Sequence, residues 1–253
     1  MTADAADTDD RLLGGRVVLR QSASGFRVSV DTVLLAAAVE LAPGARALDV
    51  GCGTGGATLC LASRIADVAL LGIDREADMT AGLRANATAN SVEDRVTGET
   101  VDVAGGVPSH LRGAFDHVFS NPPYLPPGRA DTREVDAPRR RATIESVPFD
   151  VWLSFMAACC TPKGSVTVIH RADRLEEILA AFEGLNGALR VVPIWPRAGQ
   201  PARRVIVSAR LGVRSPTSLC AGLALHDAAG GYTSAARRLL EDGMALSAVN
   251  AAG

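Results

Sequence analysis

The segment RALDVGCGTG, at Arg46–Gly55, joins a run typical of a buried β-strand to a loop that contains three glycines. A helical stretch follows at Ala57–Ile65. Glycine lets the chain turn sharply and lets a ligand approach main-chain N–H groups with no Cβ in the way. Strand, glycine loop and helix in this order favour a nucleotide-binding α/β protein, although the loop alone is also compatible with a plain strand-to-helix turn.

Outward from this loop, short β-branched runs alternate with helical stretches, which predicts a doubly wound α/β sheet. The expected strands cover residues 46–50, 68–73, 96–101, 115–120, 165–169, 189–194 and 204–209, and the expected helices cover 57–65, 76–90, 149–160 and 171–184. Only a Pro- and Gly-rich loop separates the last two strands, and so short a connection requires an antiparallel hairpin. We therefore expect a Rossmann-like, seven-stranded, mostly parallel sheet with an antiparallel C-terminal hairpin and helices on both faces.

The chain has 253 residues, about the size of one large domain. We predict an acidic, disordered tail at residues 1–13 and a single domain at 14–253, whose N-terminal extension reaches about residue 45. Hydrophobic residues make up 47% and charged residues 21%, which excludes a disordered chain. No apolar run approaches the ~20 residues of a membrane helix, and the acidic N-terminus differs from a secretory signal, so we expect a cytoplasmic protein. Five cysteines without a C-x-x-C pair predict neither a disulfide framework nor a metal site.

Acidic residues end the two strands that follow the glycine loop. Asp74 comes about 20 residues after the loop, where a carboxylate can accept hydrogen bonds from a ribose. Asp102 ends the next strand and could accept from an adenine amino group. Either residue alone could equally be a helix cap or a turn residue. Together with the glycine loop they predict a crevice for an adenosine-bearing ligand at the carboxyl edge of the sheet.

The fourth strand ends in SNPPY, at Ser120–Tyr124. N-P-P is a turn builder, but this turn follows the strand expected beside the glycine loop, where ligands of open α/β sheets bind. The Asn121 amide oxygen and a backbone carbonyl offer two acceptors, which match the two N–H groups of a planar –NH2 group. Tyr124 supplies a ring on which a flat group can stack.

These motifs, in order and at suitable spacing, resemble those of the class I S-adenosylmethionine-dependent methyltransferases, specifically the N-P-P-Y amino-methyltransferases. The resemblance implies S-adenosylmethionine as the cofactor and a planar exocyclic or amide nitrogen as the methyl acceptor. It places the methionyl end of the cofactor at the glycines, the ribose at Asp74 and the adenine at Asp102. It makes Asn121, Pro122 and Tyr124 the catalytic residues, of which Asn121 and the Pro122 carbonyl accept both hydrogens of the amino nitrogen.

Three outer segments resemble a narrower group, the bacterial tRNA(Val) (adenine-N6) methyltransferases. They are the upstream segment Leu19–Ala37, which contains GFRVSVDTVLLA, the segment PARRVIV at Pro201–Val207 and the C-terminal segment His226–Thr233. This resemblance implies methylation of the exocyclic N6 of an adenine in RNA, with tRNA as the preferred partner, and a helix over the cofactor that begins at Asp31 and Thr32. For Asp31 a plain N-cap is the alternative interpretation. The full set of implied cofactor contacts is Asp31, Thr32, Asp49, Gly51, Gly53, Thr54, Gly55, Asp74, Asp102 and Asn121.

Arginines gather where acids are absent: residues 184–226 hold six arginines and no Asp or Glu. We expect Arg203 and Arg204 to bind the phosphates of an RNA substrate near the mouth of the site. The opposite wall of this surface would be formed by Arg139, Arg140 and Arg141. For the arginine-rich segment 184–226 a solvated surface is the alternative interpretation. The net charge is only −2, so no overall field draws the protein to nucleic acid.

Other functions stay open at this point. The methyl acceptor could be another planar nitrogen, in an rRNA base or in a release-factor glutamine. About 48 residues precede the glycine loop, which leaves little room for the helical domain that release-factor methyltransferases carry there. A non-catalytic cofactor-binding module would not need the intact SNPPY, and the early third glycine disfavours an NAD-dependent dehydrogenase.

Overall fold

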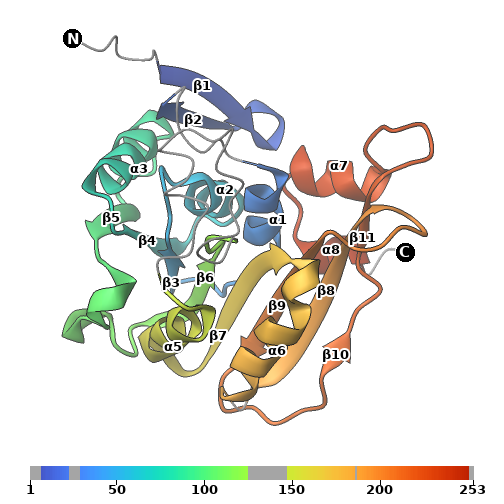
Figure 1. Cartoon of the computed structure of the whole chain (residues 1–253). Coiled ribbons are helices and arrows are strands. Elements are labelled where there is room, and N and C mark those ends of the chain that lie inside the picture. Colours follow the sequence, from blue (N-terminus) through green and yellow to red (C-terminus); the bar gives the residue numbers. More distant parts are fainter. Residues whose placement is uncertain (1–6, 23–28, 125–146, 186, 251–253) are drawn as a thin grey trace, which may run out of the picture.

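The structure, a computed structural model, describes residues 7–22, 29–124, 147–185 and 187–250. Its strands are β1 (Asp7–Leu12), β2 (Val17–Ser22), β3 (Ala45–Val50), β4 (Val68–Asp74), β5 (Val96–Thr100), β6 (Phe115–Ser120), β7 (Cys160–Arg171), β8 (Ala188–Arg197), β9 (Arg204–Arg210), β10 (Ser218–Leu219) and β11 (Leu223–His226). Its α-helices are α1 (Val30–Ala38), α2 (Gly56–Arg64), α3 (Ala77–Ala89), α5 (Phe149–Cys159), α6 (Leu175–Glu183), α7 (Ser234–Leu240) and α8 (Leu246–Asn250). Figure 1 shows their arrangement around one large sheet.

The large sheet has the order β10-β8-β9-β7-β6-β3-β4-β5, and β11 also pairs with β8. Strands β3 to β9 are the seven that the sequence predicts, and among the described strands of this sheet β9 alone runs antiparallel to its neighbours, β7 and β8. The predicted fold class is therefore confirmed. The two short edge strands, β10 and β11, were not predicted, because two to four residues carry no periodic pattern.

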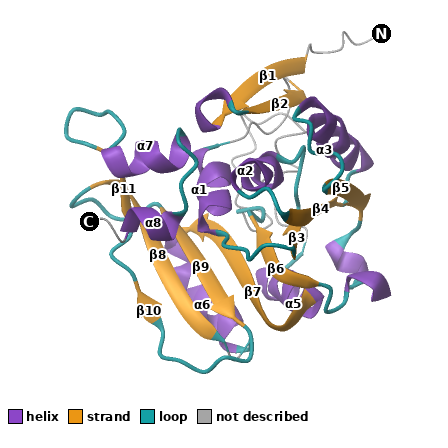
Figure 2. Cartoon of the chain, turned by 180° about the vertical axis from the view of Figure 1, so that it is seen from behind, coloured by secondary structure: helices purple, strands orange, loops and turns teal. Residues whose placement is uncertain are grey.

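Helices cover both faces of the sheet because successive strand residues point to opposite sides. Val118 and Phe119 are neighbours in β6, yet they belong to different apolar clusters. The cluster of Phe119 includes residues of α1, α2, α7 and α8, and that of Val118 includes residues of α5 and α6. Accordingly α6 lies in front of the sheet in Figure 1 and behind it in Figure 2. This layering leaves the carboxyl ends of the strands free to form a site.

The N-terminal strands β1 and β2 form a separate antiparallel hairpin. We predicted a disordered tail at residues 1–13, and for residues 7–13 this is wrong; residues 1–6 lie outside the described residues. The ion pair of Asp9 with Arg20, at 3.4 Å, and the register of the two strands show that the acidic residues face partners in β2. Acidic composition was a misleading signal here, because those partners come from the next strand.

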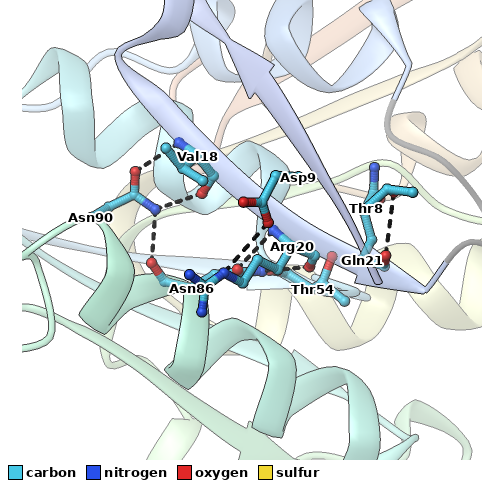
Figure 3. Close-up of polar contacts among 8 residues, drawn as sticks. All are labelled: Thr8, Asp9, Val18, Arg20, Gln21, Thr54, Asn86 and Asn90. Atoms are coloured by element: carbon cyan, nitrogen blue, oxygen red, sulfur yellow. Dashed lines mark hydrogen bonds and ion pairs between the residues drawn. The ribbon is translucent and has the colours of Figure 1, made fainter. Parts of the chain in front are cut away.

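The hairpin is bound to helix α3 and to the residue after it through two asparagine side chains (Figure 3). The amide of Asn90 accepts from the Val18 N–H at 2.9 Å and donates to the Val18 carbonyl at 2.7 Å. The amide of Asn86 does the same for Arg20, at 2.9 and 3.0 Å. Residues four apart on a helix share a face, and residues two apart on a strand share an edge. The two amides therefore make the hydrogen bonds with β2 that a neighbouring strand would make, which explains why β2 is ordered.

Within the described residues, no helix is long and apolar enough to cross a membrane.

Candidate active site

The predicted site residues meet because their strands are neighbours in the sheet. Strand β3 pairs in parallel with β4 on one side and with β6 on the other. The glycine loop after β3, Asp74 at the end of β4 and the SNPPY turn after β6 therefore lie at one edge. The Ser120 hydroxyl joins two of these strands directly, since it donates to the Val50 carbonyl at 2.6 Å.

The three glycines of the loop, Gly51, Gly53 and Gly55, all have positive φ, at 74°, 54° and 93°. A Cβ at Gly55 would lie 2.2 Å from a methyl group of Leu83, so close packing also requires glycine there. Gly53 differs, because among the described residues no atom beyond its chain neighbours lies within 4 Å of the place its Cβ would take. The loop thus turns an open main-chain surface outward, and this space fits an approaching cofactor.

Asp74 is hydrogen-bonded to the loop that it follows. One carboxylate oxygen accepts from the Gly53 N–H at 3.0 Å, and the other accepts from the Glu76 N–H at 3.0 Å. Burial raises the pKa of this half-buried carboxyl group. Two donors leave further lone pairs of the carboxylate free, so it can still accept from a ribose hydroxyl. As predicted, Asp74 therefore lies next to the glycine loop.

Asp49 lies beneath the loop and is almost fully buried. Its carboxylate accepts from the Thr58 hydroxyl at 2.7 Å, and burial raises its pKa to about 7. Asp102 is exposed, and its carboxylate accepts from the Ala104 N–H at 2.9 Å, which caps a short 3-10 helix at Val103–Gly105. The capping interpretation of Asp102 thus describes its internal contact, and its exposure leaves the carboxylate accessible to a ligand.

Sequence reasoning missed two residues that hold this edge of the sheet in place. The buried amide of Asn86 donates to the Thr54 carbonyl at 3.0 Å, so the helix that binds the N-terminal hairpin also binds the glycine loop (Figure 3). The Trp152 indole donates to the Ser120 hydroxyl at 3.0 Å. No motif marks either residue, although an asparagine on the apolar side of a predicted helix is a usable signal.

Tyr124, the last residue of the SNPPY turn, contacts residues from three segments of the chain. Its hydroxyl group is hydrogen-bonded to the Asn121 side-chain oxygen and lies 3.1 Å from a carboxylate oxygen of Asp31. The same oxygen of Asp31 accepts from Arg204 Nε at 2.7 Å. The Arg204 guanidinium carbon also lies over the Tyr124 ring, 5.2 Å from its centroid. Helix α1, strand β9 and the turn after β6, which are far apart in the sequence, therefore converge on one ring.

These contacts change the roles expected for two residues. Asp31 is not an N-cap, because the residue before α1 is Ser29 and the buried Asp31 side chain points to Tyr124 and Arg204. Arg204, which we expect to bind RNA phosphates, has a side chain that is 33% exposed and ion-paired with Asp31.

The other arginines of the expected phosphate-binding surface have different outcomes. Arg203 is exposed, as a surface residue should be. The opposite wall that we predicted, at Arg139, Arg140 and Arg141, lies outside the described residues. Its role therefore stays a prediction.

A histidine that the sequence analysis did not single out packs against Tyr124. His170 is fully buried, its ring centroid is 5.0 Å from that of Tyr124, and Phe149 contacts it from another side at 5.6 Å. Its Nδ1 accepts from the Arg171 N–H at 2.8 Å, and the described residues provide no hydrogen-bond partner for Nε2. Burial lowers its pKa to about 4, so the ring is neutral near pH 7.

Known proteins share the fold of this chain. A family model described as methyltransferase small domain matches residues 24–136. A solved structure titled as a predicted O-methyltransferase, protein Atu636 from Agrobacterium tumefaciens, is 25% identical and superposes with a TM-score of 0.69, over 83% of this chain and 94% of that one. Pyrococcus horikoshii TYW2 in complex with MeSAdo, at 12% identity and a TM-score of 0.57 over 83% and 73% of the chains, shares the fold. The sheet order and the site thus define an S-adenosylmethionine-dependent methyltransferase.

Curated relatives narrow this class. A protein of Serratia proteamaculans is 30% identical over 222 residues, which cover 86% of this chain and 83% of the relative. One of Dickeya chrysanthemi is 29% identical over 225 residues, covering 86% and 87%. Both are named tRNA1(Val) (adenine(37)-N6)-methyltransferase. The chain belongs to this methyltransferase family.

Proposed function

We propose that this protein transfers a methyl group from S-adenosylmethionine to the exocyclic N6 of an adenine in tRNA, and that it does so in the cytoplasm. The observation that carries the proposal is the position of Asn121 and Tyr124 at the end of β6, joined through Ser120 to the strand that leads into the glycine loop. The choice of adenine as the methylated base and of tRNA as the substrate follows the names of the relatives.

In this proposal the bound cofactor supplies a methyl group on a positively charged sulfur. Asn121 Oδ1 and the Pro122 carbonyl accept the two hydrogens of the adenine amino group, which pyramidalises the nitrogen and directs its lone pair to the methyl carbon. The new N–C bond forms as the S–C bond breaks, and the nitrogen becomes positive, so both acceptors gain strength in the transition state. A proton then leaves the nitrogen to water, and no strong base is required.

The cofactor-binding roles follow the geometry of the loop. Gly51, Gly53 and Gly55 let the methionyl end approach the main chain, and Asp74 accepts from the ribose hydroxyls. Exposed Asp102 accepts from the adenine amino group of the cofactor. The further contacts in this proposal are Thr54 in the loop, Asp49 beneath it and Thr32, which is buried next to Asp31 in the first turn of α1.

The RNA is proposed to contact the end of the sheet beside Arg204. Arg203 and Arg197 border the loop between β8 and β9, and both are exposed. His226 pairs with Arg197 in register and stacks on Tyr232, with centroids 4.9 Å apart. Figure 1 shows this loop and the loop between β11 and α7 projecting from the same end of the molecule. Exposed arginines beside an aromatic pair suit phosphates and unstacked bases.

The test is transfer of labelled methyl from S-adenosylmethionine to unmodified total tRNA, with rRNA and release factor assayed in parallel. We expect label in N6-methyladenosine of one tRNA. The Asn121→Ala variant is the control, because it removes the proposed acceptor. Label confined to rRNA or to a release-factor glutamine would contradict the tRNA assignment and leave the amino-methyltransferase chemistry standing. No label in any of the three would contradict both.

A further inference from the structure

The Tyr124 hydroxyl has a single hydrogen but two acceptors within reach. One is the Asn121 side-chain oxygen and the other is a carboxylate oxygen of Asp31, at 3.1 Å. A phenol can donate to only one of them at a time. The hydroxyl must stay protonated to donate at all, and burial raises its pKa well above the ordinary value. The network therefore has two possible arrangements with the same atoms in nearly the same places.

The two arrangements differ in what Asn121 can offer. While the hydroxyl donates to Asn121, the amide oxygen is polarised by a hydrogen bond inside the protein and is a weaker acceptor for another donor. When the hydroxyl donates to Asp31 instead, Asn121 Oδ1 is free. Asp31 is the stronger of the two acceptors by charge, because hydrogen bonds to a carboxylate are about twice as strong as neutral ones. Its distance of 3.1 Å is slightly longer than the ordinary range of O–H···O hydrogen bonds, about 2.5–3.0 Å, so this bond is able to shorten.

Arg204 holds the Asp31 carboxylate in position. Its Nε donates to the same carboxylate oxygen at 2.7 Å, and the Asp31 side chain is only 12% exposed. Its guanidinium carbon also lies over the Tyr124 ring, 5.2 Å from the ring centroid, and the centroid of the buried His170 ring lies 5.0 Å from it in an edge arrangement. These two contacts restrain the ring when its hydroxyl changes partner. The hydrogen can thus move between acceptors without moving the ring.

We propose that Asp31 and Arg204 are positioning residues that draw the Tyr124 hydroxyl away from Asn121 when the substrate amino group arrives, so that Asn121 Oδ1 is free to accept from the nitrogen to be methylated. The inference rests on the proposed amino-methylation, but not on which molecule carries the amino group. It also gives Arg204 a role distinct from phosphate binding. Arg203, the preceding residue in the chain, is exposed and keeps the phosphate role.

A double-mutant cycle tests the inference, with the substrate that takes up label in the methyl-transfer assay. Asp31→Asn alone should lower kcat about 10- to 100-fold, equivalent to ~1.4–2.7 kcal/mol, and change KM for the substrate less than about threefold. In the Tyr124→Phe background, which has no hydroxyl to redirect, the same change should lower kcat less than about twofold. Arg204→Gln should behave like Asp31→Asn in both backgrounds, and Arg204→Lys should restore only part of kcat because lysine lacks the planar Nε donor.

Two arginine variants serve as controls for the positioning role. Arg203→Gln should raise KM for an RNA substrate. Arg112 is an exposed arginine just before β6, at the opposite edge of the sheet, so Arg112→Gln should change neither kcat nor KM. Equal losses of kcat in both backgrounds would overturn the positioning role, as would an Arg204→Gln variant with raised KM and unchanged kcat.

Thermal unfolding extends the cycle to conditions without substrate. Asp31→Asn should lower Tm by about 2–4 °C, and by clearly less in the Tyr124→Phe background, because the lost hydrogen bond is shared between the two residues. Coupling in Tm without coupling in kcat would mean that the network serves only stability, and would also overturn the inference. If no substrate is labelled, the proposed function fails at that earlier step, and absence of coupling in Tm overturns the network by itself.

Discussion

The Asn86 amide and the Tyr124 hydroxyl each tie a distant segment to the site, but the two groups differ in their supply of hydrogens. The Asn86 amide has two hydrogens and two carbonyls to receive them, Arg20 and Thr54, and its oxygen accepts from the Arg20 N–H. The Tyr124 hydroxyl has one hydrogen for two acceptors. A network with matched donors and acceptors has one arrangement, whereas an unmatched network has two. The cofactor end is therefore fixed, and the substrate end can respond to a ligand.

The largest expected effect is at the substrate end. Asn121→Ala removes the acceptor that is proposed to stabilise the positive charge on nitrogen, and we expect kcat to fall at least about 100- to 1,000-fold. Cofactor affinity, measured by calorimetry, should stay within a few-fold. A large loss of cofactor affinity would mean that Asn121 belongs to the fixed end of the site, and the contrast between the two ends would fail.

A pH titration of stability should also distinguish the surroundings of Tyr124, where His170 lies, from the cofactor end. The pKa of His170 is lowered to about 4 by burial, against an ordinary value near 6.5. Between these two values the unfolded chain binds a proton at this histidine that the folded chain does not, so the contribution of His170 to the free energy of unfolding falls by up to ~3 kcal/mol as the pH falls from about 6.5 to 4, and this contribution stays level below. Urea unfolding across this range should therefore show a steeper dependence in the native protein than in His170→Gln. The same slope in both proteins would contradict the assignment.

Substitution of the matched amides tests the cofactor end. Asn86→Ala removes a buried side chain and leaves two carbonyls and an N–H group without this partner, and should lower the free energy of unfolding by about 2–3 kcal/mol. Asn90→Ala is the matched control, since it binds the same hairpin through Val18 and not the glycine loop. We expect weaker cofactor binding for Asn86→Ala and unchanged cofactor binding for Asn90→Ala. Equal cofactor affinity in the two variants would show that the Thr54 contact does not hold the loop.

The smallest effect should come from the surface. Arg203→Gln removes one phosphate contact, so the slope of log K against log salt concentration for RNA binding should fall by about 0.7–0.9. Filter binding at several salt concentrations measures this slope. An unchanged slope would place the RNA elsewhere, and would leave Arg203 as part of a solvated surface.

Most of the architecture was predictable from local sequence. Strands β3 to β9 were predicted, most of them within a few residues, because their β-branched runs are long and their flanking loops are rich in glycine and proline. The hairpin of β1 and β2 was missed because its order depends on Asn86 and Asn90, about 70 residues further along the chain. The acidic strand β1 pairs only with β2 among the described strands, and β2 in turn is bound by the two distant asparagines, so neither strand has a periodic signature of its own.

The amino-acid sequence alone determined the chemistry of this protein, because the glycine loop, Asp74 and SNPPY each end a strand, and parallel strands bring their carboxyl ends to one edge. The tertiary structure alone decided that Asp31 and Arg204 meet at Tyr124. Asp31 and Arg204 are separated by 173 residues, and their contact depends on how α1 packs and on the register of β9 in the sheet. Such a contact leaves no mark in local sequence, since either residue alone is an ordinary aspartate at a helix start or an ordinary arginine at the start of a strand.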